Sequence, residues 1–365
     1  MDNREFFKKQ PFCLAQSEKE KVFLFEMKRL VKWHYEKCQE FKILCDNRNF
    51  SISGDFELEE LPYFPVSIFK KFDIMSVPRE KIIKILYSSS TSGEPSKIMI
   101  DKETADNQSI VVNNILSDFF GKERMHFIIF DNEEVLTSSS HELSSRGTAI
   151  RGMISMAKKM SFVLDRELNL DVSKIESIMD EIREGDKVCF FSFTWLIYNI
   201  YLNNKDNERV INIFRKLKNQ EKNILHIGGW KKLKDIAVSK EKFNENIGNI
   251  FNVPKEKIVD FYGMTEQLGT VYPDCEYGYK HIPIYSEIII RDIDTLKSLN
   301  NNQAGFIQFL SPLPHSYPGI SILSDDIGEI VGVDDCKCGR KGKYFLFEKR
   351  SEKAEVRGCG DSLKI

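Results

Sequence analysis

Short apolar runs that each end in a glycine, an aspartate or a polar turn place the strongest constraint on how this chain folds. The runs cover residues 125–131, 187–193, 222–229 and 257–263. Helical patterns lie between them, for example over residues 172–185 and 207–220. Strands that alternate with helices, and that are apolar on both faces, are typical of a largely parallel sheet covered by helices. The sequence therefore predicts an α/β fold.

The two ends of the chain follow other patterns. Residues 17–46 carry apolar side chains at helical spacing, which predicts one or two amphipathic helices, with Ser17 and Glu20 as a capping box. From residue 286 onward, short strands alternate with turns, which indicates a small β-rich lobe. We expect four segments: an N-terminal helical region (1–86), an α/β core (87–270), the β-rich lobe (271–348) and a hinge-like tail (349–365).

The composition excludes several classes of protein. The chain has 53 basic and 55 acidic side chains, so its formal net charge is −2 and it lacks the electrostatic footprint of a nucleic-acid-binding protein. No run approaches the roughly 18 apolar residues of a membrane span, and the N-terminus lacks the apolar core of a signal peptide. We expect a cytoplasmic protein whose eight cysteines are reduced and act as buried apolar groups, metal ligands or reactive thiols.

A loop rich in hydroxyl groups follows the apolar run that ends at Tyr87. It contains Ser88, Ser89, Ser90, Thr91, Ser92 and Gly93 and leads to Lys97. Backbone amides, hydroxyl groups and a nearby ammonium group are suited to wrap the oxygens of a phosphate. A solvated surface loop is the alternative, because such loops often have the same composition.

A second candidate motif, Tyr262-Gly263-Met264-Thr265-Glu266, lies at the end of an apolar run about one domain later. Its aromatic ring, glycine, hydroxyl and carboxylate are suited to cover a base, contact a phosphate and hold Mg²⁺, which prefers oxygen ligands. Taken alone, the same segment also fits a strand end with an exposed acid.

Together the two motifs resemble the adenylate-forming superfamily of acyl and aryl ligases. Three further matches occur in the family's order: the adenine-flanking turn Gly228-Gly229-Trp230, the ribose-binding Asp326, and the ribose-contacting Arg350 of a hinge stretch. The resemblance implies a nucleotide-binding core that uses ATP and Mg²⁺, with Thr265 at the α-phosphate, Glu266 at Mg²⁺ and Lys97 near the transferring phosphate. Two positions depart from the pattern, because Ser90 replaces a glycine and Ser96 takes the place of the usual lysine.

Within the superfamily, the chain is similar almost end to end to the acyl-protein synthetases of bacterial fatty-acid reductase complexes. The shared stretches include 65–70, 145–147, 190–195, 226–230 and 355–360. The resemblance implies that ATP activates a carboxylic acid, in the first place a fatty acid, as an acyl adenylate. The acyl group would then form a thioester with Cys359 and pass to an NADPH-dependent acyl reductase.

The C-terminal tail carries this acceptor cysteine between Gly358 and Gly360, next to Arg357, which is suited to stabilise a thiolate. The chain stops seven residues after Gly358 (365 − 358 = 7), so we expect the mobile C-terminal domain of ordinary superfamily members to be absent. An inert tail cysteine is the alternative for Cys359. An acyl- or aryl-CoA or carrier-protein ligase, and a non-catalytic nucleotide-binding regulator, are the alternative functions.

Four further side chains form a candidate metal site: Cys275, His281, Cys336 and Cys338. Three thiolates and one imidazole are a closed Cys₃His set of the kind that zinc prefers, although four unrelated side chains in turns are the alternative. The other cysteines, and the aromatic run 190–195, are predicted to pack in the core; the cysteines are Cys13, Cys38, Cys45 and Cys189. The aromatic run could also line an acyl tunnel, and His226 could contact the acyl group, whereas His34 is interpreted as structural.

Overall fold

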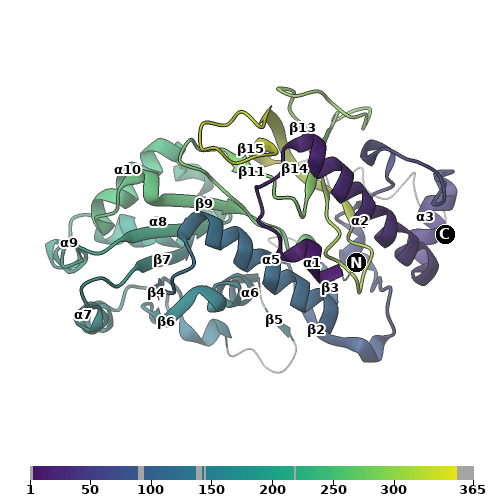
Figure 1. The fold of residues 1–365 in the computed structure, drawn as a ribbon. Helices are drawn as coiled ribbons and strands as arrows, with labels where there is room; N and C mark the ends of the chain where they lie inside the picture. Colours follow the sequence, from purple (N-terminus) through teal and green to yellow (C-terminus); the bar gives the residue numbers. More distant parts are fainter. Residues whose placement is uncertain (1–2, 89–93, 137–141, 144, 218, 352–365) are drawn as a thin grey trace. The chain divides into compact units, whose positions relative to one another are not determined.

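The computed structural model describes residues 3–88, 94–136, 142–143, 145–217 and 219–351 (Figure 1). The chain divides into two compact units. Unit 1 comprises Met1–Asp118, Ser140–Ser145 and Gly263–Ile365, and unit 2 comprises Phe119–Ser139 and Arg146–Tyr262. Unit 1 thus combines the two ends of the chain, whereas the four consecutive segments expected from the sequence stay a prediction.

Unit 2 is built on a parallel sheet whose strands follow the order β9-β8-β7-β4-β6 (Figure 1). The strands are β4 (Met125–Ile129), β6 (Ala157–Phe162), β7 (Val188–Phe193), β8 (Lys222–Ile227) and β9 (Ile258–Tyr262). The helices are α6 (Ser145–Gly152), α7 (Val172–Glu181), α8 (Thr194–Asn204), α9 (Glu208–Arg215) and α10 (Lys240–Phe251). Each of the four apolar runs contains one of these strands, so the predicted α/β fold with a parallel sheet is confirmed.

The core of unit 2 is rich in phenylalanine. Phe190 of β7 packs against Phe214 of α9 with their ring centroids 5.7 Å apart, and Phe214 packs against Phe251 of α10 at 4.6 Å. Phe130, directly after β4, adds an edge-on contact with Phe251 at 5.1 Å. Every residue of β7 is buried, so Phe190, Phe191 and Phe193 lie in a core strand as predicted. Trp195, the last residue of the predicted aromatic run, instead lies in α8 and is half-buried.

Unit 1 contains two sheets. The larger has the strand order β11-β15-β14-β13-β12, with β1 added parallel to β14, and the smaller has the order β3-β2-β5. The strands of these two sheets are β1 (Phe64–Pro65), β2 (Ile82–Tyr87), β3 (Lys97–Asp101), β5 (Glu142–Leu143), β11 (Lys280–His281), β12 (Glu287–Arg291), β13 (Gly305–Leu310), β14 (Ser321–Val333) and β15 (Lys343–Arg350). A further short strand, β10 (Tyr272–Pro273), belongs to neither of these sheets. Strands β12 to β15 are antiparallel neighbours and form the predicted β-rich lobe.

The helices of unit 1 come from the N-terminal part of the chain. They are α1 (Asn3–Lys8), α2 (Gln16–Lys37), α3 (Gln39–Asn47), α4 (Ile68–Lys71) and α5 (Lys102–Phe120). Short 3₁₀ helices in the two units cover Leu58–Glu60, Arg79–Lys81, Glu133–Leu136, Ile154–Met156, Lys231–Ile236, Lys255–Lys257 and Thr265–Gln267. No helix among the described residues is both long enough and apolar enough to cross a membrane.

The predicted capping box at the start of α2 is wrong. The helix begins at Gln16, and the side chain of its N-cap residue, Ala15, makes no hydrogen bond to the first turn. Instead the backbone N–H of Gln16 donates to Asp334 Oδ2 at 2.9 Å. A carboxylate far away in the sequence therefore satisfies one of the donors that a helix N-terminus leaves open.

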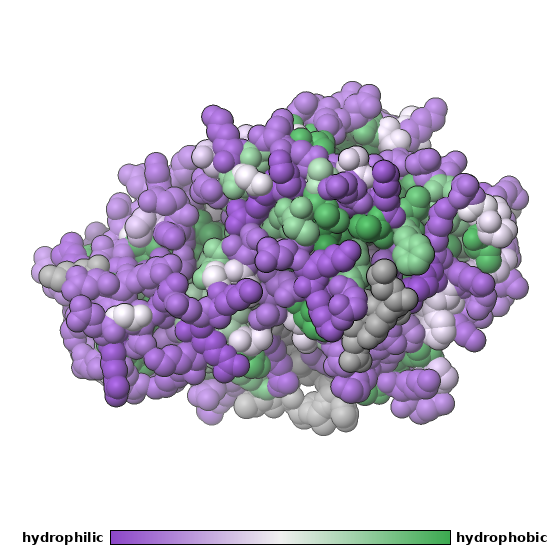
Figure 2. Space-filling view, in the orientation of Figure 1, coloured by the Kyte–Doolittle hydropathy of each residue, from purple (hydrophilic) through white to green (hydrophobic). Residues whose placement is uncertain are grey.

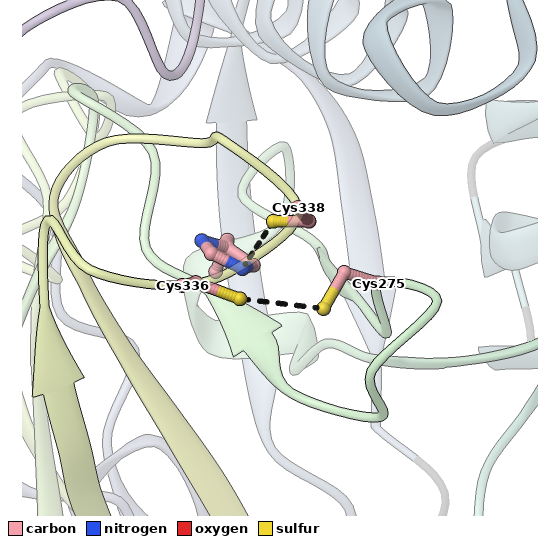
Figure 3. A group of neighbouring side chains, drawn as sticks. Cys275, Cys336 and Cys338 are labelled. Carbon is pink, nitrogen blue, oxygen red and sulfur yellow. Dashed lines mark hydrogen bonds between the residues drawn. The ribbon is translucent and has the colours of Figure 1, made fainter.

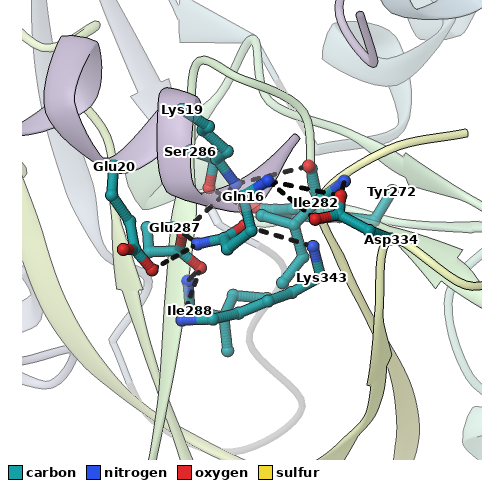
Figure 4. A network of polar contacts seen from close by, with 11 residues as sticks. Gln16, Lys19, Glu20, Tyr272, Ile282, Ser286, Glu287, Ile288, Asp334 and Lys343 are labelled. Carbon is teal, nitrogen blue, oxygen red and sulfur yellow. Dashed lines mark hydrogen bonds and ion pairs between the residues drawn. The ribbon is translucent and has the colours of Figure 1, made fainter. Parts of the chain in front are cut away.

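A buried charge network fastens the same end of α2 to the β-rich lobe (Figure 4). Glu287 of β12 is 1% exposed and lies 3.3 Å from the ammonium group of Lys19 and 3.4 Å from that of Lys343. The amide of Gln16 donates to Glu287 at 2.7 Å. Burial alone would raise the pKa of Glu287, but the two ammonium groups outweigh burial and lower it to about 2.

The four cysteines predicted to pack in the core divide into two groups. Cys38, Cys45 and Cys189 are buried, as predicted. Cys13 is exposed, so its prediction is wrong: it lies in the turn between α1 and α2, and its thiol donates to the carbonyl of Gln10. Hydrophilic residues cover most of the face shown in Figure 2, in keeping with a charged fraction of 30%.

Candidate functional site

The hydroxyl-rich loop joins two antiparallel strands of unit 1, β2 and β3. Tyr87 at the end of β2 pairs with Lys97 at the start of β3. The base of the loop is closed by two bonds, since Ser96 N–H donates to Ser88 Oγ at 2.9 Å and Ser88 N–H donates to Ser96 O at 3.1 Å. Residues 89–93, which include the predicted phosphate contacts Ser89, Ser90, Thr91, Ser92 and Gly93, lie outside the described part of the chain.

The second motif forms a 3₁₀ turn at Thr265–Gln267 in unit 1, directly after Tyr262 ends β9 of unit 2. Gln267 anchors the turn, because its amide donates to Phe309 O at 3.0 Å and to Gly319 O at 2.8 Å. Tyr317 donates to the backbone carbonyl of Glu266 at 2.8 Å. The backbone of the turn is therefore fixed by residues other than the carboxylate and hydroxyl of the motif.

Glu266 presents a carboxylate in a nearly dry environment, since the residue is only 5% exposed. Burial raises the pKa of Glu266, whereas the nearby Ser96 hydroxyl and the Arg350 guanidinium act in the opposite direction, and Asp326 adds to the increase. A buried oxygen ligand that is short of positive charge fits a divalent cation such as Mg²⁺, which accepts one or two carboxylates together with phosphate oxygens. Thr265, half-buried, lies in the same turn.

Asp326 and Arg350, which were predicted separately, stand directly opposite each other on the antiparallel strands β14 and β15. Arg350 Nε lies 3.3 Å from Asp326 Oδ1. The aspartate is buried and the side chain of the arginine is 67% exposed. Both groups also act electrostatically on Glu266, so unit 1 brings these three predicted residues into one charged cluster.

The predicted adenine turn follows β8 in unit 2. Gly228 has φ +83°, a conformation that L side chains rarely adopt, and an added Cβ would lie 3.4 Å from the ring of Phe193. Gly229 is exposed and has open space where a side chain would be. The ring of Trp230 packs edge-on against Tyr198 at 4.8 Å and Phe243 at 5.8 Å. Trp230 thus supports the turn by packing, which leaves the glycine backbone as the open part of the motif.

A polar group beside this turn was only partly anticipated from the sequence. His226 of β8 is buried, and its Nδ1 lies 2.9 Å from Thr194 Oγ1 and 3.8 Å from Asp260 Oδ1. His226 and Asp260 are register partners on the parallel strands β8 and β9. The available signal was that each residue lies near the end of its apolar run, but the involvement of Thr194 and Asp260 was missed.

The cysteine and histidine set of unit 1 is brought together by folding (Figure 3). The ligand atoms of Cys275, His281, Cys336 and Cys338 all lie within 4.8 Å of one another. Cys275, His281 and Cys336 are buried, and Cys338 is half-buried. Burial lowers the pKa of His281 to about 4, so its imidazole is neutral at pH 7 and retains a lone pair for a metal. The remaining predicted residue, Cys359, lies outside the described residues.

Comparisons with known proteins agree with the resemblance seen in the sequence. The family model described as "Acyl-protein synthetase, LuxE" matches residues 2–365. Two curated relatives bear the name long-chain-fatty-acid–luciferin-component ligase. The one from Aliivibrio fischeri is 24% identical over 307 residues, which are 82% of this chain and 77% of the relative. The one from Vibrio harveyi is 23% identical over 347 residues, which are 92% of this chain and 86% of the relative.

A solved structure matches the fold over most of the chain. It is an open conformation of 2-hydroxyisobutyryl-CoA ligase in complex with 2-HIB-AMP and CoA, with a TM-score of 0.70 and 14% sequence identity. The match covers 93% of this chain and 76% of that chain. The likeness confirms the fold that the sequence predicted, that of an adenylate-forming ligase.

Proposed function

The chain belongs to the acyl-protein synthetase family, and from this premise we propose that it activates a long-chain fatty acid with ATP and loads the acyl group onto Cys359. The observation that carries the proposal is the charged cluster of unit 1. Asp326 and Arg350 face each other across β14 and β15, and Glu266 is buried within their electrostatic reach. The relatives named long-chain-fatty-acid–luciferin-component ligase support the choice of acid.

Each predicted site residue has a task in this proposed reaction. Asp326 accepts hydrogen bonds from the ribose hydroxyls, and the exposed guanidinium of Arg350 reaches the same sugar. Thr265 would donate to the α-phosphate, and Lys97 and the loop from Ser88 to Gly93 would supply donors to the phosphate oxygens. The family resemblance assigns Gly228, Gly229 and Tyr262 to the adenine. Glu266 would hold Mg²⁺, and the bound ion would offset negative charge on the phosphates.

The first half-reaction makes the carboxylate reactive. A carboxylate oxygen of the fatty acid attacks the α-phosphorus of ATP, a P–O bond forms, and the bond to the pyrophosphate oxygen breaks. The protein contributes mainly position and fixed charge, because phosphoryl transfer depends on both and needs little covalent chemistry from the protein. The turn at Thr265–Gln267 is suited to this task, since Gln267 and Tyr317 hold its backbone in place.

The second half-reaction uses the cysteine of the tail. The thiol of Cys359 loses its proton, its sulfur attacks the acyl carbonyl carbon, and the C–O bond to AMP breaks as the C–S bond forms. The thioester would then pass to an NADPH-dependent acyl reductase as partner. A cytoplasmic location, where thiols stay reduced, is part of the proposal.

ATP–pyrophosphate exchange measured over a panel of carboxylic acids tests the activation step. We expect exchange that depends on a long-chain fatty acid. Absence of exchange with every fatty and aromatic acid of the panel would contradict acyl activation and favour a non-catalytic nucleotide-binding regulator.

Replacing Cys359 with serine tests the transfer step. After incubation with ATP, Mg²⁺ and the preferred acid, the wild-type chain should gain the mass of one acyl group by intact-mass spectrometry. The Cys359→Ser variant should not gain a thioester, while its exchange activity should persist, because adenylation does not need the thiol. Cys13→Ser is the matched control, since Cys13 is exposed and lies outside the motifs. An unchanged acyl label in the Cys359→Ser variant would rule out this acceptor.

Coenzyme A is the competing acceptor, because the solved neighbour is in complex with both 2-HIB-AMP and CoA. Addition of CoA to the acid-activation assay separates the two acceptors. We expect no acyl-CoA and no loss of free CoA thiol. Rapid consumption of CoA, together with a chain that stays unacylated, would instead identify a CoA ligase.

A further inference from the structure

Two turns of unit 1 that are far apart in the sequence place four metal-binding side chains together. The first turn carries Cys275 and leads to His281 of β11, and the second, Cys336–Gly339, connects β14 with β15. Each turn is fixed by its own backbone: Gly278 N–H donates to Cys275 O at 2.8 Å, and Gly339 N–H donates to Cys336 O at 3.0 Å. Gly278 and Gly339 both have positive φ, which suits glycine.

We propose that Cys275, His281, Cys336 and Cys338 bind one structural zinc ion that fastens these two turns together. A tetrahedral ion with Zn–S bonds of about 2.3 Å places two sulfurs about 3.8 Å apart. The Sγ atoms of Cys275 and Cys336 are 3.9 Å apart. Cys338 Sγ lies 3.1 Å from His281 Nε2, so this pair would open by a few tenths of an ångström around the ion. Figure 3 shows the side chains of Cys275, Cys336 and Cys338 gathered in one place.

The chemistry of the set favours zinc over the alternatives. Mg²⁺ and Ca²⁺ take oxygen ligands, whereas three sulfurs and one imidazole nitrogen are typical of a closed zinc site. A disulfide between Cys275 and Cys336 would need the sulfurs to approach to about 2.05 Å, and it would leave Cys338 and His281 without a role. The imidazole is held by aromatic neighbours, with Tyr344 at 5.4 Å and Phe12 at 6.0 Å between ring centroids.

The surroundings match the charge and the access that such a site needs. Zinc with three thiolates and a neutral imidazole has a net charge of about −1. The guanidinium of Arg340 lies beside Cys338 and is held by Asp118 at 2.7 Å. A pocket of about 400 Å³ lined by Cys338, Arg340, Asp118 and Glu276 connects the half-buried ligand to solvent. An ion can therefore reach the ligands from the side on which Cys338 is half-buried, whereas the two carboxylates pair with Arg340.

The ion would act on the hairpin that carries Asp326 and Arg350 of the charged cluster. The second turn closes the β14–β15 hairpin, and Asp326 and Arg350 lie near its open end. His281 pairs with Tyr344 of β15, so the first turn also reaches the hairpin through β11. Zinc would thus add a cross-link at the closed end of the element whose other end holds both predicted ribose contacts. The metal site itself is independent of whether the chain activates fatty acids.

Metal analysis of the full chain, purified without chelators and without a histidine tag, tests the site. We expect about one zinc per chain. Cys275→Ser and Cys336→Ser should each lower zinc below about one tenth per chain, and Cys13→Ser should retain it, because a closed site needs all its ligands whereas Cys13 lies outside the set. Co²⁺ added to metal-free protein should give the intense visible absorption of a tetrahedral thiolate site, and Cys275→Ser should lose it.

The zinc content of the wild-type protein tests the proposed site even if a variant fails to fold. Zinc below about one tenth per chain in wild-type protein, also after supplementation with zinc, would overturn the proposal. So would a mass spectrum that shows Cys275 linked to Cys336 as a disulfide in the native protein. A chelator should lower the melting temperature of the wild-type chain, and an unchanged melting temperature with the metal removed would contradict the fastening role.

Discussion

Replacing Glu266 with glutamine should lower ATP–pyrophosphate exchange by about 100-fold or more, a loss typical of removing a charge placed at a reacting phosphate or oxyanion. The side chain keeps its shape but loses the negative charge that would hold Mg²⁺. The turn itself should survive, because Gln267 and Tyr317 anchor it through other atoms. Burial already disfavours the ionised form of Glu266, so the neutral amide should leave the melting temperature unchanged or raise it.

Glu329→Gln is the matched control for this experiment, because Glu329 lies on the same strand as Asp326 and belongs to none of the motifs. Its exchange activity should equal that of the wild-type chain. A Glu266→Gln variant that keeps exchange within about threefold of wild type would show that this carboxylate does not serve the phosphates, since charge at that place is worth far more. A variant that loses both activity and stability would point to a structural role instead.

Glu287→Gln should reduce the free energy of unfolding by about 3–5 kcal/mol, because removal of one partner from a buried ion pair leaves uncompensated charge inside the protein. Lys19 and Lys343 both face this carboxylate, and Lys19 and Glu287 are each 1% exposed. Urea unfolding of the full chain measures the effect. No loss of acid activation is expected from this substitution at low temperature, since the network lies among α2, β12 and β15 and contains none of the motif residues.

Asp55→Asn provides the contrast. Asp55 pairs with Lys28 at 2.7 Å, but its side chain is fully exposed to solvent. Solvent screens such a pair, so its loss should barely move the urea midpoint. Equal changes in the free energy of unfolding for Glu287→Gln and Asp55→Asn would contradict the prediction that the buried ion pair contributes more than the exposed one.

Low pH should lower the free energy of unfolding of the protein through protonation of Glu287. The pKa of Glu287 falls from an ordinary 4.5 to about 2 in the folded protein, so the unfolded chain takes up its proton first as the pH falls. The stabilisation is complete above pH 4.5 and disappears as the pH falls toward 2. The difference in the free energy of unfolding between wild type and Glu287→Gln should therefore become smaller as the pH falls from 4.5 toward 2. If this difference stayed constant over the range, the pKa shift of Glu287 would not be a source of stability.

Local pattern was sufficient for the elements that depend on residues close together in the chain. The apolar runs became the strands of the parallel sheet, and the alternation after residue 286 became β12 to β15. The start of α2 was not accessible in this way: Ser17 and Glu20 suggested a capping box, whereas Asp334 satisfies the first turn from the other end of the chain. Cys13 was misassigned for the same reason, since exposure depends on what packs around a turn.

Residue identity and motif order predicted which side chains to expect at a nucleotide site, including Glu266, Asp326 and Arg350. The sequence alone suffices for this, because the functional group of each side chain and the order of the motifs do not depend on folding. Only folding decided that Asp326 and Arg350 stand opposite each other with Glu266 in electrostatic reach. Folding likewise brought Cys275 and His281 to Cys336 and Cys338, and Lys19 to Glu287. These partners are separated by tens to hundreds of residues, and strand register and burial, which set their distances and charge states, arise from packing of the whole unit.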